Sequence, residues 1–195
     1  MIILVLGIVV FLGVHTLPTQ RPLRAGLIEI LGEGPYKGLF SLASAAGLGL
    51  IVWGFASYRS GGYIAVWDPP AGLRHVTLAL NWFAFVALAA AYSPLGKIKS
   101  SLRHPMLVGI KAWALAHLLA NGDLGSILLF GSLLAWAAYD RYSLKGRHLD
   151  TGARNDLGAR RSGVTAGDGI ALVVGSAAFA AMFWLHPILV GVPIG

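Results

Sequence analysis

The stretch "RHPMLVGIKAWALAHLLANGD", residues Arg103–Asp123, decides the fold. Its apolar part, Pro105–Asn121, approaches the length of about 20 mainly apolar residues that a membrane crossing requires. Yet the stretch begins with Arg-His-Pro and carries Lys111, His117 and Asn121 within or at the end of that part. Polar side chains inside a bilayer are costly, and they commonly mark functional sites. The stretch therefore predicts a membrane helix that carries a polar site.

The composition of the whole chain also indicates a membrane protein. Of its 195 residues, 56% are hydrophobic and 12% are charged, and the mean hydropathy is +0.72. These values exclude an ordinary soluble domain. The chain has no cysteine, which excludes disulfides, iron–sulfur clusters and covalently attached c-type haem. The net charge of +7 comes from basic residues between apolar runs, so we expect a lipid bilayer as the partner and no nucleic acid.

Six apolar runs are candidate membrane-spanning helices. They predict an all-α membrane protein, a single bundle of about six transmembrane helices that forms one domain over residues 1–195. The first run lacks the charged start and the cleavage motif of a signal peptide, so we expect it to be retained. The runs are Met1–Leu17, Tyr36–Ser57, Gly72–Tyr92, Pro105–Asn121, Leu124–Tyr139 and Gly169–Val190.

The basic residues predict the orientation of this bundle. The first, third and fifth loops hold twelve of the lysines and arginines, whereas the second and fourth loops hold two. Because positive loops remain in the cytoplasm, we expect both termini in the periplasm of a bacterium. The segment 140–168 is predicted to be a basic cytoplasmic loop that meets the anionic inner leaflet. Its cations are Arg141, Lys145, Arg147, Arg154, Arg160 and Arg161.

A polar face on the fourth run is the main candidate site. A spacing of four residues places Trp113, His117 and Asn121 on one face of a helix, and Asn81 on the third run lies at a comparable depth. Two interpretations are open for His117. It forms a hydrogen bond to Asn81 between helices, or its neutral imidazole binds a metal or a haem iron. For Lys111 we expect a side chain that reaches the inner membrane surface.

Other histidines are possible second ligands to an iron held by His117. His15 differs from His117 in expected depth by about 12 Å along the membrane normal. His75 and His186 match the depth of His117 more closely. His104, followed by a proline, is a plausible helix start because proline suits the first helical turn.

Several segments together resemble the NnrU family of bacterial membrane proteins. They are "GVHTLP", "LRAGLIEILGEGPYKGLFSLASAAGLGLIVWGF", "RHPMLVGIKAWALAHLLANGD" and "LLFGSLLAWAAYDRYSLK". The resemblance implies an inner-membrane protein associated with nitrite and nitric oxide metabolism in denitrifying bacteria. It also implies a small apolar or nitrogen-oxide ligand, and components of nitrite or nitric oxide reductases as partners.

The same segments are similar to the plant cis-zeta-carotene isomerases, which hold a b-type haem through histidines. Carried over by motif, this resemblance implies His15 and His117 as haem ligands, and the segment "LHPIL" with His186 also resembles the isomerases. By their depth alone, His75 and His186 are weaker candidates. The plant motif has a cysteine where this chain has Ala114, so the isomerase activity is not carried over.

A third resemblance supports an alternative function. The Arg-His-Pro segment with Gly109 is similar to that of membrane methyltransferases and sterol reductases, in which it contacts a nucleotide-containing cofactor. This implies S-adenosylmethionine or NADPH at Arg103 and His104, although Leu107 replaces the family's aromatic residue. A non-enzymatic assembly protein for a nitrogen-oxide reductase is a further alternative, and the sequence leaves open whether the protein is an enzyme. The predicted cofactor-binding residues are His15, Asn81, Arg103, His104, Trp113, His117 and Asn121.

Overall fold

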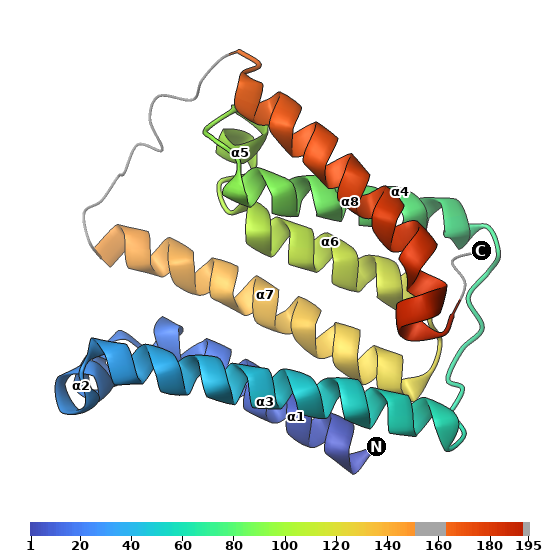
Figure 1. The fold of residues 1–195 in the computed structure, drawn as a ribbon, viewed down its shortest axis with the longest axis horizontal. Helices are drawn as coiled ribbons and strands as arrows, with labels where there is room; N and C mark the ends of the chain where they lie inside the picture. The colour runs from blue at the N-terminus through green and yellow to red at the C-terminus, as the bar shows by residue number, and fades with distance from the viewer. Residues whose placement is uncertain (151–162, 193–195) are drawn as a thin grey trace. The chain divides into compact units, whose positions relative to one another are not determined.

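A computed structural model of the chain describes residues 1–150 and 163–192, and this part is almost entirely helical (Figure 1). Within it the structure contains no β-strand, only an isolated bridge between Ala65 and Asp123. The predicted all-α fold is therefore confirmed. The elements are α1 (Ile2–Thr16), η1 (Leu17–Thr19), α2 (Arg21–Leu31), α3 (Glu33–Ser60), α4 (Leu73–Tyr92), α5 (Lys97–Leu102), α6 (Pro105–Ala120), α7 (Leu124–Asp150) and α8 (Ala166–Val190).

Four helical segments of the described chain are long and apolar enough to cross a membrane. They are Ile2–Thr19, Glu33–Ser60, Leu73–Tyr92 and Ala166–Val190. Helix α6 is apolar but has 16 residues, a length of about 24 Å at 1.5 Å per residue. The four segments indicate a membrane protein, while six crossings and periplasmic termini stay predictions.

Three segments differ from the predicted pattern. Helices α2 and α5 occupy stretches that were expected to be loops, because a search for apolar runs misses short helices with charged residues. Helix α7 continues past Tyr139 to Asp150, and no proline interrupts this extension. Within the predicted basic segment 140–168, α7 thus extends to Asp150 and α8 begins at Ala166, and the cytoplasmic location of the segment stays a prediction. Of the loop cations, Arg154, Arg160 and Arg161 lie outside the described residues.

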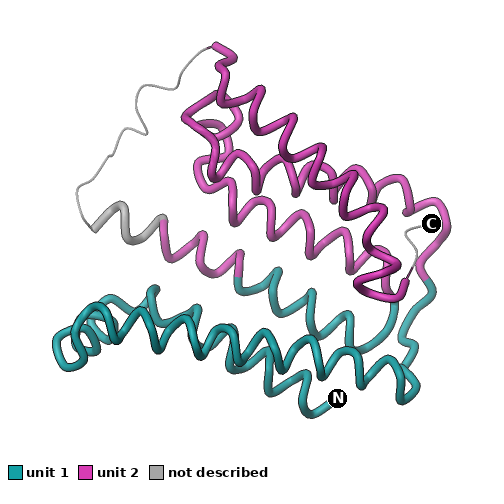
Figure 2. The backbone as a smooth tube through the Cα atoms, viewed as in Figure 1, with its two compact units in different colours: residues 1–68, 122–136 teal, residues 69–121, 137–195 magenta. Residues whose placement is uncertain are grey.

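The chain divides into two compact units, which are coloured separately in Figure 2. Unit 1 consists of residues 1–68 and 122–136, and unit 2 consists of residues 69–121 and 137–195. Helix α7 thus contributes its first part to unit 1 and its remainder to unit 2.

In unit 1, glycines allow α1 and α3 to pack with their backbones in contact. A Cβ atom on Gly47 would lie 2.8 Å from the backbone nitrogen of Phe11, and one on Gly7 would lie 2.6 Å from that of Ile51. Only a residue without a side chain fits such positions, and small residues commonly serve this purpose between membrane helices. The Gly-rich and Ala-rich segment of α3 is therefore the packing face for α1.

In unit 2, α4 runs antiparallel to both α6 and α8 (Figure 1). Glycines again mark the close contacts. A Cβ atom on Gly109 of α6 would lie 3.0 Å from the carbonyl oxygen of Ala84, and one on Gly175 of α8 would lie 2.6 Å from Cα of Val86. These two contacts fix the register of α6 and α8 against α4, and that register positions the candidate site.

Candidate functional site

Unit 2 contains a cavity of about 400 Å³ between α4, α6 and α8. It lies at the beginning of α4 and at the ends of α6 and α8, next to Pro69 and Pro70. Its size falls in the range of small-molecule sites, which are mainly apolar with a few placed polar groups. The polar and nitrogen-bearing side chains that line it are Arg74, Thr77, Asn81, Trp113, His117, Asn121 and His186.

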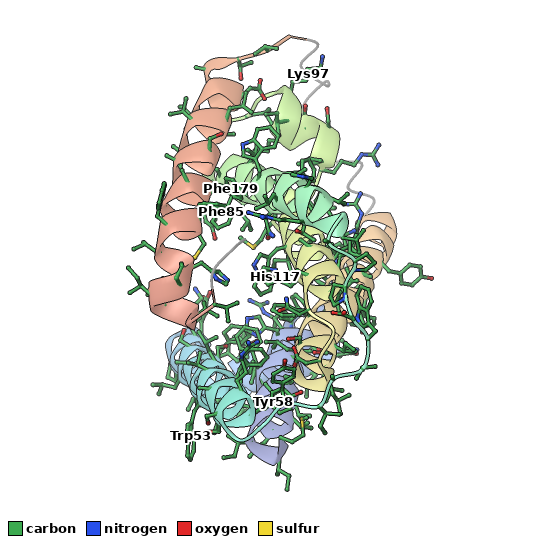
Figure 3. The ribbon with its side chains drawn as sticks, turned by 90° about the vertical axis from the view of Figure 1, so that its right-hand side faces the viewer. Trp53, Tyr58, Phe85, Lys97, His117 and Phe179 are labelled. Atoms are coloured by element: carbon green, nitrogen blue, oxygen red, sulfur yellow. The ribbon has the colours of Figure 1, made fainter. Side chains whose placement is uncertain are left out.

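Aromatic rings form much of the cavity wall. Phe85 of α4 and Phe179 of α8 lie next to each other in Figure 3, with ring centroids 6.1 Å apart. Phe183 lies one turn further along α8, and its ring centroid is 6.4 Å from that of Phe179. On α6, the ring centroids of Trp113 and His117 are 4.7 Å apart. A flat, apolar ligand suits such walls, because aromatic rings stack or meet edge to face.

The helix register brings two histidines to a similar level in this cavity. His117 lies eight residues beyond Gly109, and His186 lies eleven residues beyond Gly175. Gly109 contacts Ala84 of α4, and Gly175 contacts Val86. Because α6 and α8 both run antiparallel to α4, eight residues back from Ala84 and eleven residues back from Val86 place His117 and His186 near residues 76 and 75 of α4. The two imidazoles therefore enter the cavity at about the same depth, from different helices.

The imidazoles of His117 and His186 have the same tautomer. Nδ1 of His117 lies 2.8 Å from the carbonyl oxygen of Trp113, and Nδ1 of His186 lies 2.6 Å from that of Val192. A carbonyl oxygen only accepts, so both Nδ1 atoms donate, and the ring lone pair is on Nε2. A backbone carbonyl that holds one ring nitrogen in this way is the usual second contact of a metal-binding histidine.

The neutral polar side chains of the cavity are bonded to their own helices. Asn81 Nδ2 donates to the Thr77 carbonyl oxygen at 3.0 Å, and Thr77 Oγ1 donates to the Arg74 carbonyl oxygen at 2.8 Å. Asn121 Nδ2 donates to the His117 carbonyl oxygen at 2.9 Å. The hydrogen bond of Asn81 is thus within α4, and not the interhelical bond to His117 that was one interpretation of the sequence.

His15 belongs to unit 1 and lies in a cluster of aromatic rings. Its Nδ1 donates to the carbonyl oxygen of Phe11 at 2.7 Å. Its ring centroid lies 4.2 Å from that of Phe11, 5.4 Å from that of Phe40 and 5.8 Å from that of Trp136. His15 and His117 are therefore in different units, and their pairing as haem ligands stays a prediction.

Arg103 and His104 lie at the opposite end of α6 from the cavity. They precede the helix start at Pro105, whereas His117 is about 20 Å further along at 1.5 Å per residue. Arg103 has a φ of 60°, in the left-handed region that favours glycine, and it ends α5. His75 is exposed on α4 and is not among the residues that line the cavity.

A family model described as NnrU protein matches residues 3–194 of the chain. The chain belongs to the NnrU family. No match was found among curated proteins or among solved structures. The NnrU match confirms the resemblance of the sequence segments, and it includes the cavity residues on α4, α6 and α8.

In this NnrU protein, the cavity gathers four of the seven predicted cofactor-binding residues, namely Asn81, Trp113, His117 and Asn121. It also brings in His186, which the sequence ranked behind His15, and Arg74, one of the two basic residues assigned to the second and fourth loops. The residues that the structure describes contain no cluster of three or more histidines, cysteines or carboxylates that could hold a metal ion. An iron here would need most of its ligands from a macrocycle.

Proposed function

We propose that this NnrU-family membrane protein binds haem b in the cavity of unit 2 through His117 and His186. The observation that carries the proposal is the presence of two imidazoles at about one level of an apolar, aromatic cavity, both with Nδ1 bonded to a carbonyl oxygen. Imidazole is an established protein ligand of haem iron, and His117 and His186 would hold the iron here. When bound, the haem supplies one-electron chemistry.

The residues present fit a haem in three further respects. Phe85, Phe179 and Phe183 provide flat apolar walls. The chain has no cysteine to supply a thiolate, and imidazole is an established ligand of haem iron. His186 replaces His15 in this proposal because it lines the same cavity as His117, whereas His15 belongs to unit 1.

We propose that the protein acts in nitrite or nitric oxide metabolism, or supports the proteins that carry it out. Membership of the NnrU family and the sequence resemblance support this role. A small nitrogen-oxide molecule is the expected ligand, and components of a nitrite or nitric oxide reductase are the expected partners. The proposal covers the chain as one membrane domain, since the family match extends over residues 3–194.

We further propose that the protein crosses the inner membrane of a bacterium six times, with both termini in the periplasm. The four long apolar segments provide four crossings. Helix α6 and the first part of α7 would provide the other two. The unequal distribution of lysine and arginine between the loops supports this orientation.

The direct test of haem binding is an absorption spectrum of the protein purified in detergent after expression with added haem precursor. We expect a Soret band, and a pyridine haemochrome spectrum of haem b. A colourless protein that also fails to bind haem on titration would overturn the proposal. A colourless protein that co-purifies with a reductase subunit would instead favour the assembly function.

The backbone at Arg103 supports a second candidate function. A non-glycine residue at a φ of 60° is sparsely populated, and such residues gather at functional sites. The Arg-His-Pro segment there is the one that resembles methyltransferases. Calorimetric titration with S-adenosylmethionine tests this alternative. If it is right, the cofactor binds the wild type, and Arg103→Ala raises the Kd. The absence of any heat of binding in several detergents would exclude it.

A further inference from the structure

Arg74 is the one acidic or basic residue, histidine aside, among the side chains that line the unit 2 cavity. Its backbone N–H donates to the Ala71 carbonyl oxygen at 3.2 Å, and its own carbonyl oxygen accepts Thr77 Oγ1 at 2.8 Å. The lining contains no aspartate or glutamate. Within the described residues, the Arg74 guanidinium has neither an ion pair nor a hydrogen bond. The cavity therefore carries an unbalanced positive charge.

Neither helix stability nor membrane topology explains an arginine at this position. Arg74 lies in the first turn of α4, where the helix dipole favours negative charge and disfavours a cation. The start of α4 also lies at the end of the helix that the charge distribution assigns to the periplasm, where the positive-inside rule calls for few cations. Arg74 is exposed at the start of α4 and lines the cavity, so its charge is available to a ligand there.

The geometry of α4 determines where a bound anion would lie. Arg74, Thr77, Asn81 and Phe85 follow one another at helical spacing along the cavity. Side chains on a helix tilt toward its N-terminus, and the lining beside the start of α4 includes Pro69, Pro70 and Ala71. Phe85 lies about 16 Å deeper along the helix at 1.5 Å per residue. An anion at Arg74 would thus lie near the start of α4, at about the level of the two imidazoles, and the ring of Phe85 would lie deeper along the helix.

We propose that Arg74 binds a carboxylate at the edge of the ligand in this cavity, which makes that ligand an acidic amphiphile with a flat or elongated apolar body. The inference rests on the proposed function in that it concerns the same cavity; in haem the carboxylate is a propionate. A guanidinium can hold a carboxylate through two parallel hydrogen bonds. Lysine at this position would retain the charge but not the paired bonds.

The test compares two ligands that differ only in the carboxylate. Protein without cofactor, in nanodiscs of neutral phosphatidylcholine, is titrated with haem b and with its dimethyl ester, and the Soret change gives each Kd. We expect the wild type to bind the acid at least tenfold more tightly than the ester. Arg74→Gln should remove this preference, Arg74→Lys should restore part of it, and Arg59→Gln, an arginine of unit 1 outside the cavity lining, should leave it unchanged. Equal Kd values in the wild type, or a preference that survives in Arg74→Gln, would overturn the inference.

A second pair of ligands separates this inference from haem binding itself. If neither porphyrin binds, the proposed function fails, and oleate and methyl oleate are titrated by calorimetry under the same conditions. A preference for oleate that Arg74→Gln abolishes supports the carboxylate site without haem. Failure to bind either acid overturns the inference. The inference is also overturned if Arg74→Gln changes only the thermal stability of the protein, in nanodiscs with anionic phosphatidylglycerol, and no ligand affinity. Arg74 would then bind a lipid headgroup.

Discussion

The carboxylate of Asp168 accepts the backbone N–H of Ile98 at 2.7 Å. The same carboxylate accepts the N–H of Lys97 at 3.0 Å and that of Thr165 at 2.8 Å. The first N–H groups of a helix lack partners within the helix. The Asp168 side chain, which is 3% exposed, accepts hydrogen bonds from such N–H groups at the starts of both α5 and α8. This links two segments of unit 2 that are far apart in the sequence.

Asp168→Asn is expected to lower the free energy of unfolding by about 1–3 kcal/mol, because an amide offers one acceptor oxygen and turns an N–H donor toward backbone donors. The measurement is thermal or denaturant unfolding in detergent. Asp68→Asn is the matched control, since Asp68 is exposed and exposed substitutions usually change stability by less than about 0.5 kcal/mol. Equal effects of the two variants would show that Asp168 is not the link described here.

Gly47 and Gly49 in α3 provide a matched pair for the packing of unit 1. A Cβ atom on Gly47 would lie 2.8 Å from the backbone nitrogen of Phe11, whereas one on Gly49 would meet nothing within 4 Å. We expect Gly47→Ala to destabilise the protein by about 1–3 kcal/mol through overpacking. Gly49→Ala should be neutral or stabilising by up to about 1 kcal/mol, as alanine is the better helix former. The melting temperatures of the two variants test this, and a Gly47→Ala variant as stable as Gly49→Ala would contradict the close contact of α1 and α3.

The proposed topology can be tested with single cysteines, because the natural chain has none. Asp68→Cys lies in the connection between α3 and α4, and Gly163→Cys precedes α8; both positions are exposed. In intact spheroplasts, a membrane-impermeant maleimide should label Asp68→Cys, while Gly163→Cys should react only after lysis. The unmodified protein is the control for background labelling. The reverse pattern would place the termini in the cytoplasm.

The sequence predicts those parts of the fold that depend on local patterns. Apolar runs placed α1, α3, α4, α6 and α8 within a few residues of their observed ends, because an uninterrupted apolar segment and a helix coincide there. The same criterion missed α2, whose apolar residues alternate with Arg21, Arg24 and Glu29. It also ended α7 too early, since the apolar run stops at Tyr139 but the helix does not.

The candidate site shows the same division between local and distant features. The face of Trp113, His117 and Asn121 follows from the period of a single helix, and the cavity confirms that these residues lie together. The addition of His186 and Arg74 depends on how α8 and α4 are aligned. That alignment is set by the contact of Gly175 with Val86, and no periodicity within one segment expresses it.

The most direct test of the haem site in unit 2 is the low-spin haem spectrum of three histidine variants. If His117 and His186 are the ligands, His117→Ala and His186→Ala should each lose or shift the Soret band and the low-spin signal. His15→Phe, which keeps an aromatic ring in its cluster, should retain both. Size-exclusion profiles and melting temperatures confirm that each variant is folded. A spectrum that changes in His15→Phe and is unaffected in folded His186→Ala would contradict the assignment.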